Sequence, residues 1–202
     1  MIVATPLDLP KIEPDNWDTF WKIWNKESRN AIKIKKNTDM SVSPIGQSNL
    51  WQGLDIYKNY NLVPTWNVPY YNIKNDLPIL HQQILNLPFK YIYCVRILKS
   101  LADINAHTDD NKDHWAVRAF WHCNDVDSQW YFTQPHHHAS EKTFFHLPND
   151  TNWFAYNDKH AWHGTVYRKA YPKFLMQVFI AGDITPLINS SIDKYKEYTI
   201  QL

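Results

Sequence analysis

The sequence predicts a mainly β domain that begins with helices, and three observations carry this prediction. The chain has 202 residues, the length of one ordinary domain. Residues 1–89 show helical periodicity interrupted by proline-containing loops. From Lys90 onward, short runs of β-branched and aromatic residues alternate with Asn, Asp, Pro and Ser. We therefore expect one domain, with a helical support over 1–89 and an antiparallel sandwich or barrel over 90–202.

Two helices are expected in the first region. The first covers about 17–31, because aromatic residues recur there every three to four positions and Asp15 or Asn16 can cap it. The second covers 76–87, where Asn75 or Asp76 supplies the cap. Both helices have an apolar stripe, so we expect them to pack against the β region.

The expected strands are short and follow one another without intervening helices. An edge strand with outward lysines is expected at 32–36, before the second helix, and a looped connection at 62–71. The strands of the β region are expected at 91–98, 115–123, 129–133, 143–147, 152–156, 161–167, 173–181 and 195–202.

Composition and charge exclude several classes of protein. Lys and Arg number 21 against 20 Asp and Glu, so no basic field is available for nucleic acid. The two cysteines, Cys94 and Cys123, are too few for a disulfide framework. No apolar run has the roughly 18 residues of a membrane span, and prolines interrupt the N-terminal segment where a signal peptide would be apolar. We expect a cytoplasmic protein, and the sequence leaves its oligomeric state open.

Histidine is concentrated in one part of the chain, since nine of the ten lie between His107 and His163. His107 and Asp109 are two residues apart, so on extended chain they point to the same side and can reach one cation. His160 and His163 follow some fifty residues later, at the start of an expected strand. Two histidines and one carboxylate, with the opposite positions open, are the ligand set that suits non-haem iron(II).

Lys173 opens a late strand ten residues after His163. An HxD motif, a distal His and a basic residue about ten positions further resemble the Fe(II)/2-oxoglutarate-dependent oxygenases. The resemblance covers about residues 91–180 and implies a double-stranded β-helix, a jelly-roll or cupin-like fold, within a single oxygenase domain over 1–202. The strings RILKSLADINAHTDD, WAVRAF and NWFAYNDKHAWHG look most like the aspartyl/asparaginyl- and prolyl-hydroxylase-like branches.

By this resemblance, His107, Asp109 and His163 bind Fe(2+), and Lys173 holds the distal carboxylate of 2-oxoglutarate. The family more often has Arg at the last position, where Lys offers a point charge in place of a bidentate fork.

Two alternatives stay open for these roles. A competing register takes His160 as the distal ligand and Arg168 as the anchor. Arg118, on the strand after the HxD motif, is a further candidate for the cosubstrate carboxylate, with Tyr93 and Trp130 as pocket walls.

The implied function is an iron(II)- and 2-oxoglutarate-dependent hydroxylase. It would consume O2, release succinate and CO2, and act on an amino-acid, peptide or small-molecule substrate that the sequence does not identify. The alternative is a cupin-like barrel that binds a metal or ligand without turnover. A zinc hydrolase with the same ligands is a third possibility, but the chain has no general-base motif such as HExxH.

Overall fold

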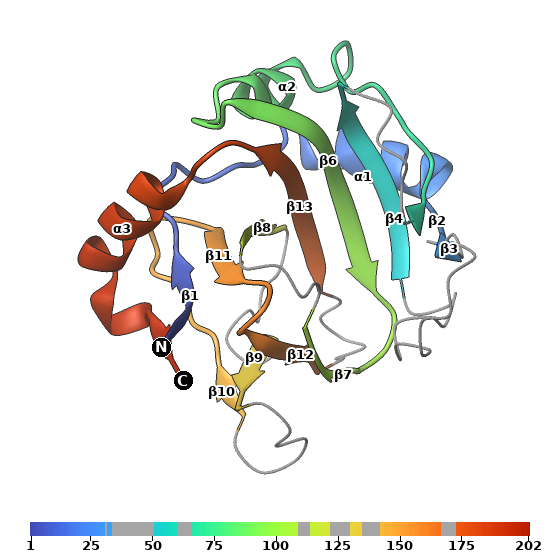
Figure 1. Ribbon diagram of the computed structural model, residues 1–202. Helices are drawn as coiled ribbons and strands as arrows, with labels where there is room; N and C mark the ends of the chain where they lie inside the picture. Colours follow the sequence, from blue (N-terminus) through green and yellow to red (C-terminus); the bar gives the residue numbers. More distant parts are fainter. Residues whose placement is uncertain are drawn as a thin grey trace.

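The computed structural model describes residues 1–30, 32–33, 51–59, 66–108, 114–121, 130–134, 142–166 and 173–202. Two antiparallel sheets dominate this part of the chain, one with eight strands and one with four (Figure 1). The mainly β class predicted from the sequence is therefore confirmed. No helix within these ranges is both long and apolar enough to cross a membrane.

The large sheet carries most of the fold. Its strand order, from one edge to the other, is β14 (Ile200–Gln201), β1 (Ile2–Pro6), β11 (Trp153–Asn157), β8 (Trp115–Phe120), β13 (Phe174–Ala181), β6 (Tyr91–Ser100), β4 (Trp51–Lys58) and β2 (Arg29–Asn30).

The small sheet lies over one end of the large one (Figure 1). Its order is β10 (Thr143–Phe144), β9 (Trp130–Thr133), β12 (Trp162–Thr165) and β7 (Ile104–His107). A separate ribbon pairs β3 (Ile32–Lys33) with β5 (Trp66–Asn67).

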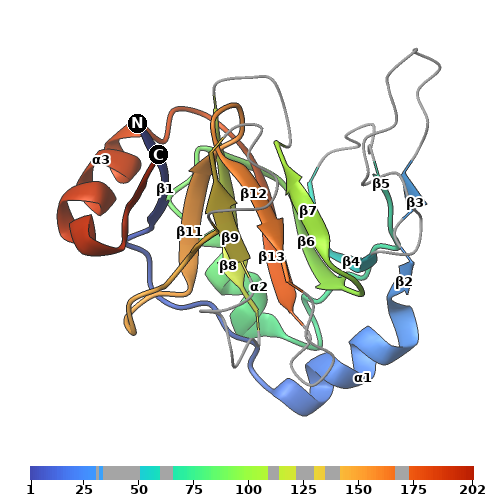
Figure 2. The ribbon, with the colours of Figure 1, turned by 90° about the horizontal axis from the view of Figure 1, so that it is seen from below.

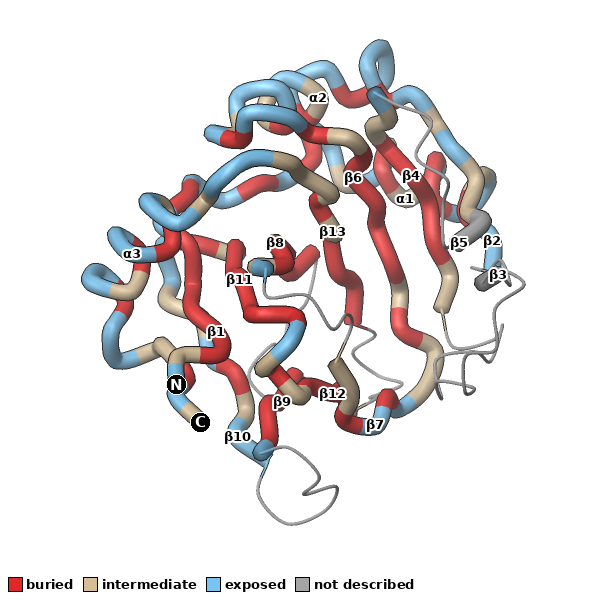
Figure 3. The backbone as a smooth tube through the Cα atoms, viewed as in Figure 1, coloured by how far each residue is buried: buried red, intermediate tan, exposed pale blue. Residues whose placement is uncertain are grey.

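The outer face of the large sheet packs against α1 (Trp17–Glu27) and α2 (Pro78–Leu85), which lie on the same side of it (Figure 2). Buried residues of both helices share one apolar cluster with the strand residues that alternate onto this face. A third helix, α3 (Thr185–Lys194), lies beside β1 (Figure 1). Figure 3 shows the strands largely buried, while α2 and α3 keep exposed stretches.

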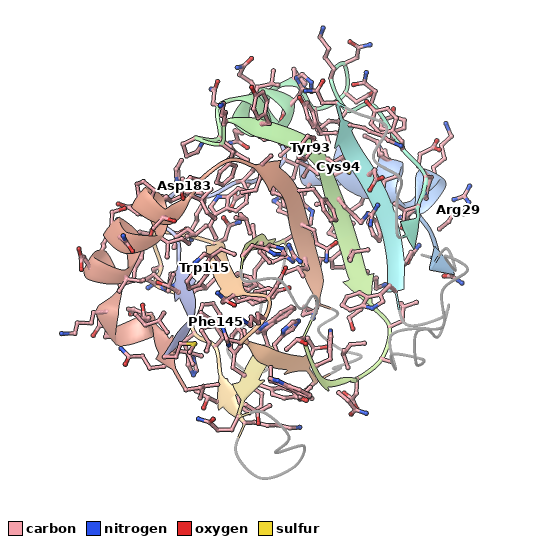
Figure 4. All side chains as sticks on the ribbon, viewed as in Figure 1. Arg29, Tyr93, Cys94, Trp115, Phe145 and Asp183 are labelled. Atoms are coloured by element: carbon pink, nitrogen blue, oxygen red, sulfur yellow. The ribbon has the colours of Figure 1, made fainter. Side chains whose placement is uncertain are left out.

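The inner face of the large sheet packs against the small sheet through a second apolar cluster. Phe145 shows how this cluster joins the two sheets. Its backbone N–H donates to the Trp130 carbonyl oxygen on β9, and its ring lies 5.2 Å from that of Phe154 on β11 (Figure 4). The space between the sheets is thus bounded by aromatic side chains from both.

The two predicted helices are present but differ in their ends. α1 is capped by Asn16, whose Oδ1 accepts from Thr19 N at 2.9 Å, and it stops at Glu27 because the next residues enter β2. α2 begins at Pro78, and neither Asn75 nor Asp76 caps it. Instead, Asp15 accepts hydrogen bonds from the N–H groups of Ile79 and Leu80. A long-range contact supplies this cap, so local sequence could not reveal it.

Several elements differ from the sequence prediction, among them β7 and α3, which no expected strand or helix covers. β1 and β4 belong to the large sheet, although residues 1–89 were expected to be mostly helical; in β4, Gly53 and the charged Asp55 obscure the strand pattern. Residues 195–202 were expected to form a strand, but only Ile200–Gln201 do, after α3 and a 3-10 turn at Lys196–Tyr198. Pro186, in the first turn of α3, is compatible with this helix start.

Candidate metal and cosubstrate site

His107 and His163 lie directly opposite each other on neighbouring strands of the small sheet. β12 pairs with β7 in an antiparallel ladder whose register places His163 beside His107. Opposed residues point to the same face of a sheet, and here the two ring centroids are 4.6 Å apart with planes inclined at 50°. His163 is 2% exposed, whereas His107 is partly exposed. The fold therefore brings together two histidines that are separated by more than fifty residues.

Both imidazoles are oriented by the same kind of hydrogen bond. His107 Nδ1 lies 2.8 Å from the carbonyl oxygen of Asn105, and His163 Nδ1 lies 2.9 Å from that of Ala161. Since a carbonyl oxygen can only accept, each Nδ1 carries the proton in this arrangement. With the proton on Nδ1, Nε2 is the ring nitrogen that can offer a lone pair to a metal ion. A backbone carbonyl that fixes the tautomer in this way is a usual second partner of metal-binding histidine.

The spacing of the two rings fits a shared metal ion. A metal–nitrogen distance of about 2.1 Å puts two imidazoles on one ion with centroids roughly 4.5 to 5.5 Å apart. The observed 4.6 Å lies in this range. The expected third ligand, Asp109, lies outside the described residues. Within the described ranges, no group of three or more His, Cys, Asp or Glu side chains is placed to hold a metal ion.

Lys173 is buried between the sheets, at 1% exposure. Its strand neighbour Phe174 packs on α1 through Trp21 and Trp24, so Lys173 points to the opposite, inner face. Its Nζ lies 4.4 Å from the Trp130 ring centroid and 5.1 Å from that of Trp51. The ammonium group thus contacts two indole rings, Trp51 on β4 of the large sheet and Trp130 on β9 of the small sheet.

Trp130 connects the lysine to the histidines. Its ring stacks on His163 at 5.1 Å and 8°. Thr165 pairs with Trp130 in the β12–β9 ladder and is also buried. Thr165 Oγ1 and Trp130 Nε1 are buried, and neither has a hydrogen-bond partner in the part of the chain that the structure describes. The inner face beside His163 therefore holds two polar groups that a ligand can satisfy, next to the buried Lys173 ammonium group.

Arg118 is linked to His163 through Tyr156. It is 7% exposed, its Nη1 donates to the Val117 carbonyl oxygen at 3.0 Å, and its Nη2 donates to the Tyr156 hydroxyl at 3.1 Å. The guanidinium carbon lies 5.3 Å from the Tyr156 ring centroid, and that ring lies 4.5 Å from His163. His163 thus contacts two aromatic rings that also contact each other: Trp130, which carries Lys173, and Tyr156, which carries Arg118.

The remaining candidates are placed differently. His160 lies in the turn before β12, partly buried, and its N–H donates to Asn157. Tyr93 is half-buried on β6 (Figure 4). Arg168 lies outside the described residues.

Sequence reasoning did not single out Tyr156, nor a buried ion pair between Arg96 and Asp55. Arg96 Nε donates to Asp55 Oδ1 at 2.7 Å, and both side chains are 5% exposed. The signal that could have revealed the pair is a charged residue inside an otherwise apolar strand, in CVRIL for Arg96 and in GLDIY for Asp55.

Comparison with known proteins adds no family to this geometry. No protein-family model matches the chain, and no curated protein matches it at a significant level.

Proposed function

We propose that this protein is an iron(II)- and 2-oxoglutarate-dependent oxygenase that hydroxylates its substrate. In this proposal the two packed antiparallel sheets are a double-stranded β-helix, and His107, Asp109 and His163 hold the iron. The observation that carries the proposal is the pair His107–His163, opposed in one ladder with each Nδ1 held by a backbone carbonyl. The supporting observation is Lys173, a buried cation whose ammonium group lies on the indole that stacks on His163.

The chain's own residues would bind, orient and shield the reacting groups. Iron(II) with 2-oxoglutarate and O2 supplies the oxidising chemistry, in which 2-oxoglutarate becomes succinate and CO2 while the substrate gains a hydroxyl group. The carbonyls of Asn105 and Ala161 keep the two imidazoles in the tautomer that offers Nε2. Trp130 and Tyr156, which both contact the buried His163 ring, would keep water away from it.

Lys173 is the proposed anchor for the distal carboxylate of 2-oxoglutarate. Its buried ammonium gains most from a carboxylate partner because the surrounding indole rings exclude water. Thr165 Oγ1 and Trp130 Nε1, on the same inner face, can donate further hydrogen bonds to it. Arg118 and Arg168 remain the rival anchors, and the variants below distinguish them.

Anaerobic titration tests the metal site without requiring turnover. Iron(II) added with 2-oxoglutarate should produce a weak metal-to-ligand charge-transfer band in the visible spectrum of the wild type. The His107→Ala and Asp109→Ala variants should lose the band. His81→Ala is the matched control, since His81 lies on α2 outside the large sheet, and it should keep the band. Equal binding of iron and 2-oxoglutarate by wild type, His107→Ala and Asp109→Ala would refute the proposal.

Succinate formation identifies the anchor. Lys173→Ala should raise the concentration of 2-oxoglutarate needed for half-maximal succinate formation by about tenfold or more, because a charge-assisted hydrogen bond is lost. Arg168→Ala should leave it unchanged. The reverse result would select His160 and Arg168, and an effect confined to Arg118→Ala would move the anchor to β8.

A barrel that binds metal without turnover gives a different pattern. It would show the charge-transfer band with the same dependence on His107 but no succinate under O2, with or without added substrate.

A further inference from the structure

A polar row crosses the inner face of the large sheet at some distance from Lys173. Four strands contribute one residue each, at directly paired register positions: Arg118 on β8, Gln177 on β13, Arg96 on β6 and Asp55 on β4. Residues paired in this way share a face. The row next to it on the Lys173 side is apolar, with Phe120, Leu175, Leu98 and Gly53 at the paired positions.

Arg96 is the best-fixed member of this row. Asp55 accepts from its Nε at 2.7 Å and from its Nη2 at 3.3 Å, and its guanidinium carbon lies 5.3 Å from the Phe179 ring centroid. The residue is 4% exposed. Its third nitrogen, Nη1, has no hydrogen-bond partner among the described residues. The ion pair with Asp55 therefore fixes the Arg96 guanidinium and leaves its Nη1 to donate to an acceptor on a ligand.

Gln177 lies between the two arginines, on the strand that separates them. It is only partly buried, and within the described ranges its amide has no hydrogen-bond partner. The four side chains carry two positive charges and one negative charge. The N–H groups that Arg96 and Gln177 keep for a ligand, next to an excess of positive charge, are the chemistry that recognises a carboxylate.

The row is separate from the proposed cosubstrate anchor. Gln177 is four residues from Lys173 along β13, about 13 Å at the usual rise of a strand. Trp130 links Lys173 to His163, and Tyr156 links His163 to Arg118. The proposed metal ligand thus contacts one aromatic ring beside Lys173 and another beside Arg118, and one cosubstrate with its distal carboxylate on Lys173 leaves the polar row to another ligand.

We infer that Arg96 and Gln177 anchor a carboxylate of the substrate, which makes the substrate a small carboxylic acid. This inference rests on the proposed function for the role of the ligand, but the binding site itself can be tested apart from it. Asp55 acts as a positioning residue that fixes Arg96.

Gln177→Glu is the sharpest variant, because it keeps the size of the side chain and places a negative charge where the carboxylate would bind. Removal of Arg96 would leave Asp55 buried without its partner and could unfold the chain. Gln201→Glu, the same change at an exposed position of β14, is the matched control. Circular dichroism establishes that both variants are folded.

The ligands for the test are the free proteinogenic amino acids, each compared with its C-terminal amide by isothermal titration calorimetry. The protein carries Mn(II) and excess 2-oxoglutarate, so that the Lys173 region is already occupied. At least one acid should bind the wild type and Gln201→Glu more tightly than its amide does. Gln177→Glu should bind that acid about tenfold or more weakly, because like charges then face each other.

Two results would overturn the inference: no acid binds better than its amide, or Gln177→Glu binds the acid as well as the wild type. Loss of the iron–2-oxoglutarate band in Gln177→Glu would also overturn it, since the row would then serve the cosubstrate. If the wild type shows no such band while the acid still binds through Gln177, the oxygenase proposal fails and the carboxylate site stands.

Discussion

The two faces of the large sheet carry different chemistry on the same strands. Ile97 and Arg96 are neighbours on β6, yet Ile97 is fully buried in the apolar cluster under α1 and α2, whereas Arg96 turns to the inner face and pairs with Asp55. The outer face thus stabilises the fold by apolar burial. The inner face also buries charged side chains, and a buried charge destabilises the fold unless it is paired. The contrast teaches that stability and binding can be altered separately at positions one residue apart.

The largest expected effect comes from breaking the inner ion pair. Asp55→Ala leaves the Arg96 guanidinium buried without its carboxylate, so we expect the free energy of unfolding to fall by about 3–5 kcal/mol. Urea unfolding followed by tryptophan fluorescence measures it. The double variant Asp55→Ala/Arg96→Met should recover at least half of the loss, because it removes the uncompensated charge. A double variant no more stable than Asp55→Ala would show that the charge is not the cause.

A smaller effect is expected from the neighbouring outer position. Ile97→Val removes one methylene from a site with no exposed surface, and the free energy of unfolding should fall by about 0.5–1.5 kcal/mol. The iron–2-oxoglutarate band should be unchanged, since the outer face lies away from the proposed ligand site. A weakened band in a fully folded Ile97→Val protein would mean that the two faces are coupled.

Lys173→Met should change stability least while changing ligand binding most. Methionine is similar in length and carries no charge, so it removes the desolvation cost of the buried ammonium together with the contacts that the ammonium makes, including those with Trp51 and Trp130. We expect unfolding in urea without ligands to shift by less than about 1 kcal/mol in either direction. A loss of several kcal/mol would assign Lys173 to the fold instead of to a ligand.

Cys94, a buried thiol on β6, provides a pH-dependent test of burial in the large sheet. Burial raises the pKa of its thiol from 9.0 to about 12, and the nearby Asp55 carboxylate adds to the shift. The thiol of the folded chain therefore stays neutral to a higher pH than that of the unfolded chain. Its contribution to the free energy of unfolding is complete below pH 9 and is lost as the pH rises from 9 toward 12. In a Cys123→Ser background, alkylation of Cys94 by iodoacetamide at pH 9 should be much slower in the native than in the urea-unfolded protein. Equal rates would contradict the burial of the thiol.

Much of the fold could be predicted from local patterns. The aromatic spacing after Asn16 located α1, and alternating runs located β6, β8, β9, β11, β12 and β13 to within a few residues. β4 was missed because a glycine and a buried aspartate interrupt its pattern. A Cβ on Gly53 would meet Val68 and Leu98 within 3 Å, so close packing explains that glycine. The burial of Asp55 depends on Arg96, forty-one positions away.

The candidate site divides in the same way. His107, His163 and Lys173 were identified from residue types and spacing, which is information that a chain carries locally. Their mutual arrangement follows from the β7–β12 register and from Trp130, and Asp109 and Arg168 lie outside the described residues.

The sequence by itself determined the mainly β class, the two N-terminal helices and a short list of candidate metal ligands and cationic side chains, because periodicity and side-chain chemistry are local properties. Only the tertiary structure decided which side chains meet. It placed His163 opposite His107, put Asp15 at the start of α2 and aligned Arg118, Gln177, Arg96 and Asp55 across four strands. Strand pairing sets these contacts over long sequence separations, and a register shift of one residue would turn each side chain to the opposite face.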